Sequence, residues 1–361
     1  MAGIAHLERS HVRRLKGDEI LEDFRSDDAA TRAKFCEDLL WCFSEQGFVH
    51  IRDHGLSAEF VAEGFRYNRE LFRLSKEKKM TFAHPLKPNP HRGYSFVGQE
   101  NISAISGFER GEEAPARVLD LKESFDCGAP ENTHDPNVWP QEGDLPGFKD
   151  YLLDYYERCH SLQLELLSAL AQGLGLPNDT FLKMHDQRAH ELRLLHYLEV
   201  PAAAVAEADK TRIAEHTDFG TLTLLMQDGS GGLEVLHPRT RQWYPAECEF
   251  PNLTVNVGDS LMRLLNRRIH SACHRVPLCR SRIQGEVIPA RYSIAYFGKP
   301  NPDASLKPLD ALVTDDWPCA FDDVTGRQYE LLKLGKIYSS GDLEPPQLQF
   351  SINSVAKPIL A

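Results

Sequence analysis

The stretch His216-Thr217-Asp218, joined further along by His274, is the most informative pattern in the chain. Two imidazoles and one carboxylate form the 2-His-1-carboxylate set, which binds a non-heme Fe(II) ion on one face and leaves its other coordination positions open. A single His-x-Asp triplet is common, however, and can equally be a solvated turn or the cap of a helix. Its interpretation therefore depends on the surrounding sequence.

The surrounding sequence predicts a core of β-strands. Residues 221–226 and 253–257 are rich in apolar and β-branched side chains, and residues 268–276 are expected to form a further strand. Ligands carried by separate strand regions can converge at the mouth of a barrel. In a later alternating run, Arg291 and Ser293 stand two positions apart, so they face the same side of a strand and could hold a small carboxylate.

Composition limits the possible partners and compartments. The chain has 361 residues, a formal net charge of −12 and no basic cluster, which argues against a nucleic acid or an anionic membrane as partner. It contains no apolar run as long as a membrane span, and its first 30 residues lack the apolar core of a signal peptide. Eight scattered cysteines without a C-x-x-C pair indicate reduced thiols in a cytoplasmic protein.

Helices are expected on either side of the β core. Asp28 and Ser57 can each cap a helix whose apolar residues follow at helical spacing, and residues 147–173 carry a long leucine stripe. Residues 84–120 show no periodicity, and so long an irregular segment is usually either disordered or a functional loop. We favour a loop near the site, because both of its ends look ordered.

These elements predict a mixed α/β fold that is mainly β in its core. An N-terminal region of helices and strands is expected over residues 1–180, a catalytic core over 181–300, and a C-terminal extension packing on that core over 301–361. The length is sufficient either for one large core with helical additions or for two domains.

With these motifs in this order, the chain resembles the Fe(II)/2-oxoglutarate-dependent dioxygenases, and among them the isopenicillin-N-synthase-like branch. The likeness covers most of the chain and rests on short segments that are specific only in combination. They are GFVHIRDHG at 47–55, RGY at 92–94, DLKE at 120–123, HTD at 216–218, GD at 258–259, HRV at 274–276 and RYS at 291–293. The resemblance implies a double-stranded β-helix (jelly roll) flanked by helices.

The resemblance also implies roles for individual residues. The iron ligands would be His216, Asp218 and His274. The far carboxylate of 2-oxoglutarate would be bound by Arg291 and Ser293. Residues 192–197 (LRLLHY) are similar to the family's LR-x-N-Y-Y, which places Tyr197 against 2-oxoglutarate. Leu195 and His196 stand where the family usually has Asn and Tyr, so this side of the co-substrate pocket departs from the pattern.

Candidate substrate contacts follow from the same resemblance, although each could instead belong to the core. They are Phe219, Phe297, Tyr94, Leu264 and Asn266. The implied activity is oxidation of a small organic metabolite, of the kind found in specialised metabolism, by O2 and 2-oxoglutarate, giving succinate and CO2. Hydroxylation, desaturation, cyclisation, epoxidation and ring expansion all fall within it. The alternatives are an Fe(II) oxidase of this fold that does not use 2-oxoglutarate, and a non-catalytic ligand-binding protein.

Overall fold

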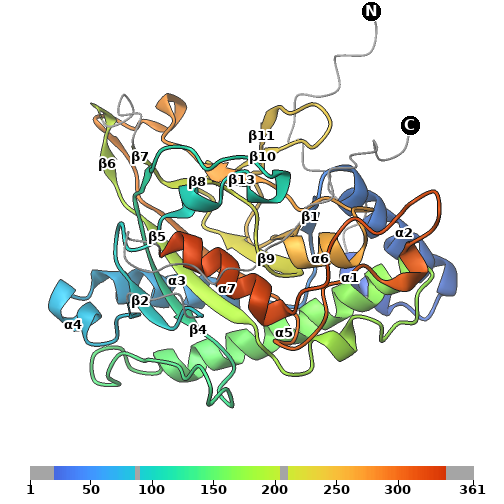
Figure 1. The fold of residues 1–361 in the computed structure, drawn as a ribbon. Coiled ribbons are helices and arrows are strands. Elements are labelled where there is room, and N and C mark those ends of the chain that lie inside the picture. The colour runs from blue at the N-terminus through green and yellow to red at the C-terminus, as the bar shows by residue number, and fades with distance from the viewer. Residues whose placement is uncertain (1–19, 86–89, 204–209, 339–361) are drawn as a thin grey trace, which may run out of the picture.

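Two antiparallel sheets form the centre of the protein, in a computed structural model that describes residues 20–85, 90–203 and 210–338 (Figure 1). The larger sheet has the strand order β1 (Phe48–Ile51), β12 (Leu253–Val257), β9 (Leu222–Gln227), β15 (Arg291–Phe297), β5 (Glu191–Tyr197), β4 (Lys122–Cys127) and β2 (Gly93–Ser95). The smaller sheet has the order β11 (Trp243–Pro245), β10 (Glu234–Leu236), β13 (His274–Val276) and β8 (Ile213–His216). Two further pairs join β14 (Val287–Ile288) to β6 (Val200–Pro201), and β3 (Leu119–Asp120) to β7 (Lys210–Thr211).

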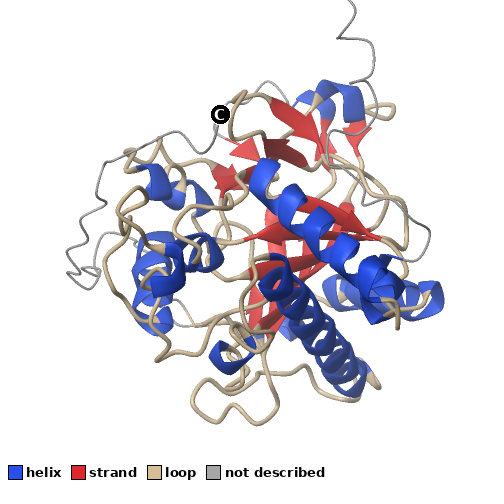
Figure 2. Ribbon diagram, turned by 90° about the vertical axis from the view of Figure 1, so that its right-hand side faces the viewer, coloured by secondary structure: helices blue, strands red, loops and turns tan. Residues whose placement is uncertain are grey.

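Helices surround the strands, as Figure 2 shows. They are α1 (Ile20–Arg25), α2 (Ala29–Glu45), α3 (Ala58–Arg73), α4 (Lys76–Met80), α5 (Phe148–Gly173), α6 (Asp259–Leu264) and α7 (Gly326–Ile337). Short 3-10 turns lie at η1 (Ile102–Ile105), η2 (Phe108–Arg110), η3 (Leu182–Met184), η5 (Arg280–Arg282) and η6 (Asp310–Leu312). Together these elements confirm the mixed α/β class.

The predicted helix starts are confirmed by their caps. The Asp28 side chain accepts a hydrogen bond from the backbone N–H of Thr31, and Ser57 Oγ accepts one from that of Phe60. Each bond provides an acceptor for a backbone N–H group of the first helical turn, which has no partner within the helix itself. The predicted stripe on α5 is buried, and α5 packs against α2 and β9. Helix α3 covers the large sheet at β5 and β15.

The strand predicted over residues 268–276 is mostly wrong, because only its last three residues, His274–Val276, form β13. Helix α6 precedes this segment, and the chain leaves it through Asn266 and Arg267, whose φ angles are +51° and +62°. Left-handed residues of this kind turn the chain and interrupt regular extended pairing. The segment between them and β13 runs irregularly to the site.

The predicted loop over residues 84–120 is partly ordered where the structure describes it. Its residues 93–95 form β2 at the edge of the large sheet, and η1 and η2 follow. Residues 86–89 of this loop and 339–361 of the predicted C-terminal extension lie outside the described residues. Within the described extension, α7 packs against η1. Among the described residues, none of the helices has the length and apolar character that crossing a membrane requires.

Candidate metal centre and active site

The two histidines of the motif face each other across paired strands. His216 ends β8 and His274 begins β13, and the strand register places them directly opposite. Asp218 follows two residues after His216. Its Oδ1 lies 3.8 Å from Nε2 of each histidine, and all three donor atoms lie within 4.8 Å of one another. The structure thus brings together the three predicted ligands, and they form a donor set that could hold one metal ion.

Backbone contacts orient both imidazoles in the same way. Nδ1 of His216 lies 2.8 Å from the carbonyl oxygen of Ala214, and Nδ1 of His274 lies 2.9 Å from that of Ala272. A carbonyl only accepts hydrogen bonds, so each Nδ1 must carry the proton and each Nε2 keeps its lone pair. Burial, together with the neighbouring His274, lowers the pKa of His216 to about 3. Its imidazole is therefore neutral, as metal binding requires.

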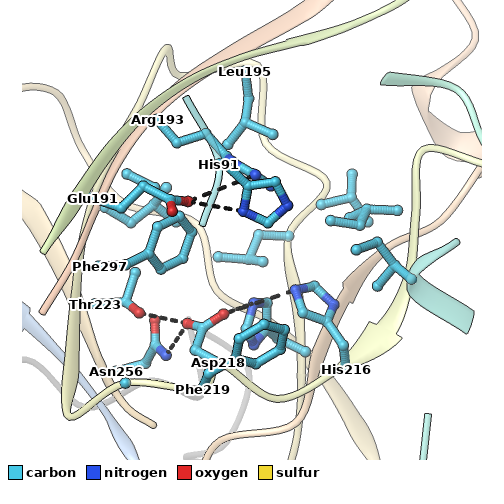
Figure 3. Close-up of a pocket in the computed structure, with 18 of the residues that line it drawn as sticks. His91, Glu191, Arg193, Leu195, His216, Asp218, Phe219, Thr223, Asn256 and Phe297 are labelled. Atoms are coloured by element: carbon cyan, nitrogen blue, oxygen red, sulfur yellow. Dashed lines mark hydrogen bonds and ion pairs between the residues drawn. The ribbon is translucent and has the colours of Figure 1, made fainter. Parts of the chain in front are cut away.

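The carboxylate of Asp218 is held by one of its two oxygens. Its Oδ2 accepts hydrogen bonds from Thr223 Oγ1 at 2.6 Å and from Asn256 Nδ2 at 2.7 Å (Figure 3). Burial alone would raise the pKa of Asp218, but the two imidazoles and these two donors outweigh it and lower the pKa. Asp218 is thus an anion whose Oδ1 points toward the two Nε2 atoms. Supporting bonds of this kind fix a metal-binding carboxylate in place.

The guanidinium of Arg291 is buried, and it lines the same cavity as the three candidate ligands. Arg291 is 1% exposed, and its three nitrogens donate to the carbonyl of Gly231, to Ser293 Oγ and to Gln227 Oε1. Tyr197 covers it, with the Arg291 Cζ 4.8 Å from the ring centre. Among the described residues, no carboxylate forms an ion pair with it. A buried cation with only neutral partners strongly favours an anionic ligand.

The cavity runs between the two sheets and connects these two features. Its lining falls into an aliphatic part near Arg291, the three candidate ligands, and a part with aromatic and charged side chains. The aliphatic part includes Ile213, Leu225, Leu233 and Val276, and the last part includes His91, Glu191, Arg193, Phe219, Phe297 and Lys299. The predicted loop contributes Ile102 and Ile105, and α7 contributes Ile337. Ser293 is fully buried beside the cavity rather than in its lining.

Only two of the five predicted substrate contacts line the cavity, namely Phe219 and Phe297. Tyr94 instead donates its hydroxyl to Glu123 on the outer strands of the large sheet. Leu264 packs in a separate apolar cluster with Leu306. Neither Tyr94 nor Leu264 therefore lies in the lining of the cavity that contains the candidate ligands.

Asn266, the fifth candidate, has a structural role outside the cavity. Its Nδ2 donates to the carbonyls of Leu312 and Pro318, and its Oδ1 accepts from the N–H of Ala320. Its amide is therefore occupied in holding residues of the C-terminal extension against α6. Asn266 does not line the cavity, since proximity in sequence to His274 did not indicate which way its side chain points.

Sequence reasoning missed the charged part of the lining. Glu191 and Arg193 lie on the same strand as Tyr197, at positions separated from it by even numbers of residues. Side chains with this spacing share one face of a strand, so the position that the resemblance implies for Tyr197 also pointed to these two residues. His91 and Lys299 lie outside β5, and only the tertiary structure brings them to it.

Comparisons with known proteins agree with this geometry. Residues 189–300 match the family model of the 2OG-Fe(II) oxygenase superfamily, and residues 21–142 match that of the non-haem dioxygenase in morphine synthesis N-terminal domain. The 2-oxoglutarate-dependent dioxygenase htyE of Aspergillus rugulosus is 42% identical over 87% of this chain and 97% of its own length. The proline hydroxylase buaE of Petromyces alliaceus is 42% identical over 88% of this chain and 97% of its own.

A solved structure is also similar over most of both chains. It is that of a full-length Neurospora crassa protein in complex with alpha-KG and thymine, with a TM-score of 0.77 and 30% identity, covering 87% of this chain and 95% of that protein. The chain belongs to the Fe(II)/2-oxoglutarate-dependent oxygenase superfamily. It is an enzyme that uses Fe(II), 2-oxoglutarate and O2 to oxidise a small molecule.

Proposed function

We propose that His216, Asp218 and His274 hold the Fe(II) ion of this oxygenase. The observation that carries the proposal is the pair of oriented imidazoles and the anchored carboxylate, whose donor atoms converge within 4.8 Å. The bound ion would supply activation of O2. The protein's own part is to keep both imidazoles neutral, to fix the carboxylate through Thr223 and Asn256, and to limit access of water.

Arg291 would bind the far carboxylate of 2-oxoglutarate, with Tyr197 and Ser293 beside it. The guanidinium is buried and lacks an anionic partner among the described residues, so a carboxylate in the cavity would compensate its charge. Gln227 Oε1 accepts from Arg291 Nη2 at 3.1 Å and fixes the direction of the fork. The overall reaction consumes one O2 and one 2-oxoglutarate, and hydroxylation would place one oxygen atom in the product and the other in succinate, with loss of CO2.

The two facing antiparallel sheets support a double-stranded β-helix as the core of this enzyme. We keep the regions 1–180, 181–300 and 301–361 as a proposal. Strands β1, β2 and β4 of the first region belong to the same sheet as β9, β12 and β15, so these regions share a core. A cytoplasmic location agrees with the eight cysteines, which form no disulfides among the described residues. The acidic net charge supports a small-molecule partner rather than nucleic acid.

The names of the similar proteins point to two kinds of substrate. One relative is named a proline hydroxylase, and the Neurospora crassa structure holds thymine. Both are small polar rings, and we propose hydroxylation of a molecule of this size.

The test is an anaerobic visible spectrum of the protein with Fe(II), recorded before and after 2-oxoglutarate is added. A weak charge-transfer band should appear in the wild type and should require far more 2-oxoglutarate in Arg291→Ala. His216→Ala should fold normally and give neither the band nor turnover. Bound iron without a band would favour the oxidase that does without 2-oxoglutarate. A protein that binds no iron would refute the proposed metal centre.

A further inference from the structure

The cavity has a charged wall that the iron and 2-oxoglutarate sites do not use. On the paired strands β5 and β15, Arg291 lies opposite Tyr197, and Phe297 lies opposite Glu191. Six residues along a strand span roughly 20 Å, so Glu191 and Phe297 stand far from the arginine that binds 2-oxoglutarate. Both belong to the cavity lining.

Glu191 is the centre of this wall, and three basic side chains of the lining surround it, while Arg92 lies 3.9 Å away outside the lining. Its Oε2 accepts from Lys299 Nζ at 2.9 Å. Its Oε1 lies 3.4 Å from His91 Nδ1 and 3.6 Å from Arg193 Nη2 (Figure 3). All four side chains line the cavity. We call His91, Glu191, Arg193 and Lys299 the charged wall.

Buried carboxylates behind the charged wall hold its arginine in place. Arg193 Nε donates to Asp126 Oδ1 at 2.5 Å, and Arg193 Nη2 donates to Glu100 Oε1 at 3.1 Å. Glu100 also forms an ion pair with Lys122, whose Nζ lies 2.5 Å from Glu100 Oε2. The wall is therefore a rigid surface.

The charged wall keeps charges of both signs despite its burial. Burial would raise the pKa of Glu191, but Lys299, His91 and Arg193 outweigh it and hold that pKa well below its usual value. Burial would lower the pKa of Lys299, but Glu191 and Glu330 raise it. The cavity thus presents an anion and two cations within one small area.

A purely structural role does not account for all of these groups. Lys299 Nζ has three N–H donors and makes two hydrogen bonds, to Glu191 and Glu330. Nε2 of His91 is buried and lies 3.2 Å from Glu100 Oε1, but without the geometry of a hydrogen bond. One N–H of the Lys299 ammonium, which lines the cavity, thus stays available to a polar ligand, and buried donors are nearly always hydrogen-bonded in folded proteins.

We propose that the substrate is a small zwitterion with the charges of an α-amino acid, and that the charged wall binds both of its charged groups. This inference rests on the proposed function. The substrate carboxylate would accept from Lys299 and Arg193, and its ammonium would donate to Glu191. Its carbon skeleton would lie against Phe297 and Phe219, which places it beside the candidate iron ligands.

The alternative is an uncharged ring such as a pyrimidine base. Neutral donors and acceptors are sufficient to recognise such a ring. Bringing ionised groups of both signs to a cavity surface has a large desolvation cost, and it is useful when the ligand is itself charged. The charges of the wall already pair with one another, so a purely anionic or purely cationic ligand would add a net charge to this buried area. A ligand with both charges fits it best.

The first experiment compares ligands on the wild-type enzyme. Common α-amino acids, including L-proline, are added to the Fe(II)/2-oxoglutarate complex beside their N-acetyl and methyl ester derivatives, thymine and uracil. We expect one or more free amino acids to perturb the anaerobic charge-transfer band and to stimulate succinate formation. The derivatives, which lack one charge, should do neither. If thymine or uracil is active and no amino acid is, the inference is overturned.

The second experiment removes the charges singly. Glu191→Gln and Lys299→Met should each raise the KM for the active amino acid by about 10- to 100-fold, the range expected for one hydrogen bond to a charged group. The KM for 2-oxoglutarate should stay unchanged, because Arg291 lies at the other end of the cavity. Lys307→Met, the same change at an exposed lysine paired with Asp310, is the matched control.

The outcomes separate this inference from the proposed function. Without a charge-transfer band in the wild type, the proposed function itself fails. With a normal band but no response to any amino acid, or with an unchanged amino-acid KM in both variants, only the zwitterionic substrate is refuted.

Discussion

The hydrogen bonds on Asp218 Oδ2 predict a measurable loss of iron affinity when they are removed. Thr223→Val and Asn256→Leu keep the approximate shape of each side chain and delete one donor each. The two bonds, at 2.6 and 2.7 Å, end on the same oxygen. A hydrogen bond to a charged group contributes about 1.5–3 kcal/mol, and changes that loosen a metal ligand typically weaken metal binding by about 10- to 100-fold.

Each single variant retains one of the two bonds, so the carboxylate stays partly oriented. We therefore expect about tenfold weaker Fe(II) binding in each single variant. In the double variant we expect a loss larger than the product of the two, since nothing then fixes Oδ2 and the carboxylate can rotate. Anaerobic Fe(II) titration, followed by the charge-transfer band at saturating 2-oxoglutarate, measures this affinity.

The matched control is Ser124→Ala, which removes a buried hydroxyl of the same sheet that has no hydrogen-bond partner in the described part of the chain. It should leave Fe(II) affinity unchanged. Thermal unfolding of the metal-free variants separates lost stability from lost affinity. An unchanged Fe(II) affinity in the double variant would show that the two donors do not orient Asp218.

Three further predictions concern stability. Gly220→Ala would place a Cβ 2.0 Å from the carbonyl oxygen of Gly298, so the backbone next to the metal motif must shift, and denaturant titration should show a loss of at least about 1–3 kcal/mol. Lys333→Met should cost about 3–5 kcal/mol, because it leaves its fully buried partner Asp259 without the opposing charge, and adding Asp259→Asn should restore part of that loss. Burial lowers the pKa of His185 to about 4, whereas in the unfolded chain its pKa is about 6.5, so the unfolded state binds the proton more tightly. The free energy of unfolding should therefore fall as the pH drops from the higher to the lower of these two pKa values, by at most about 1.4 kcal/mol per pH unit. His185→Asn should flatten that part of the stability curve.

Pairs of residues in the candidate sites could be predicted because their information is local, although His274 joins the metal site from a separate strand. His216 and Asp218 are two positions apart, and the alternation of a strand places Arg291 and Ser293 on one face. Helix starts could also be predicted from the sequence, because the side chain of a cap such as Ser57 accepts from a backbone N–H only three residues away. These features depend on neighbours within one element.

The features that were not predicted depend on distant segments. Asn266 adopts a positive φ, and its partners begin 46 residues further along the chain. Tyr94 finds Glu123 only when two strands pair. The charged wall likewise combines His91 and Lys299 with residues of β5. The periodicity of a single segment cannot predict a contact between segments so far apart in the sequence.

The pairing of β5 with β15 also has an evolutionary consequence. One pair of strands carries the proposed co-substrate residue Arg291 at one end and the residues proposed to bind the substrate at the other, at a separation set by the strand register. Substitutions at Glu191, Arg193 or Phe297 can therefore change which molecule is oxidised while Arg291 stays in place. Related enzymes can therefore differ in substrate through a few side chains on one pair of strands, while the residues of the reaction centre stay the same.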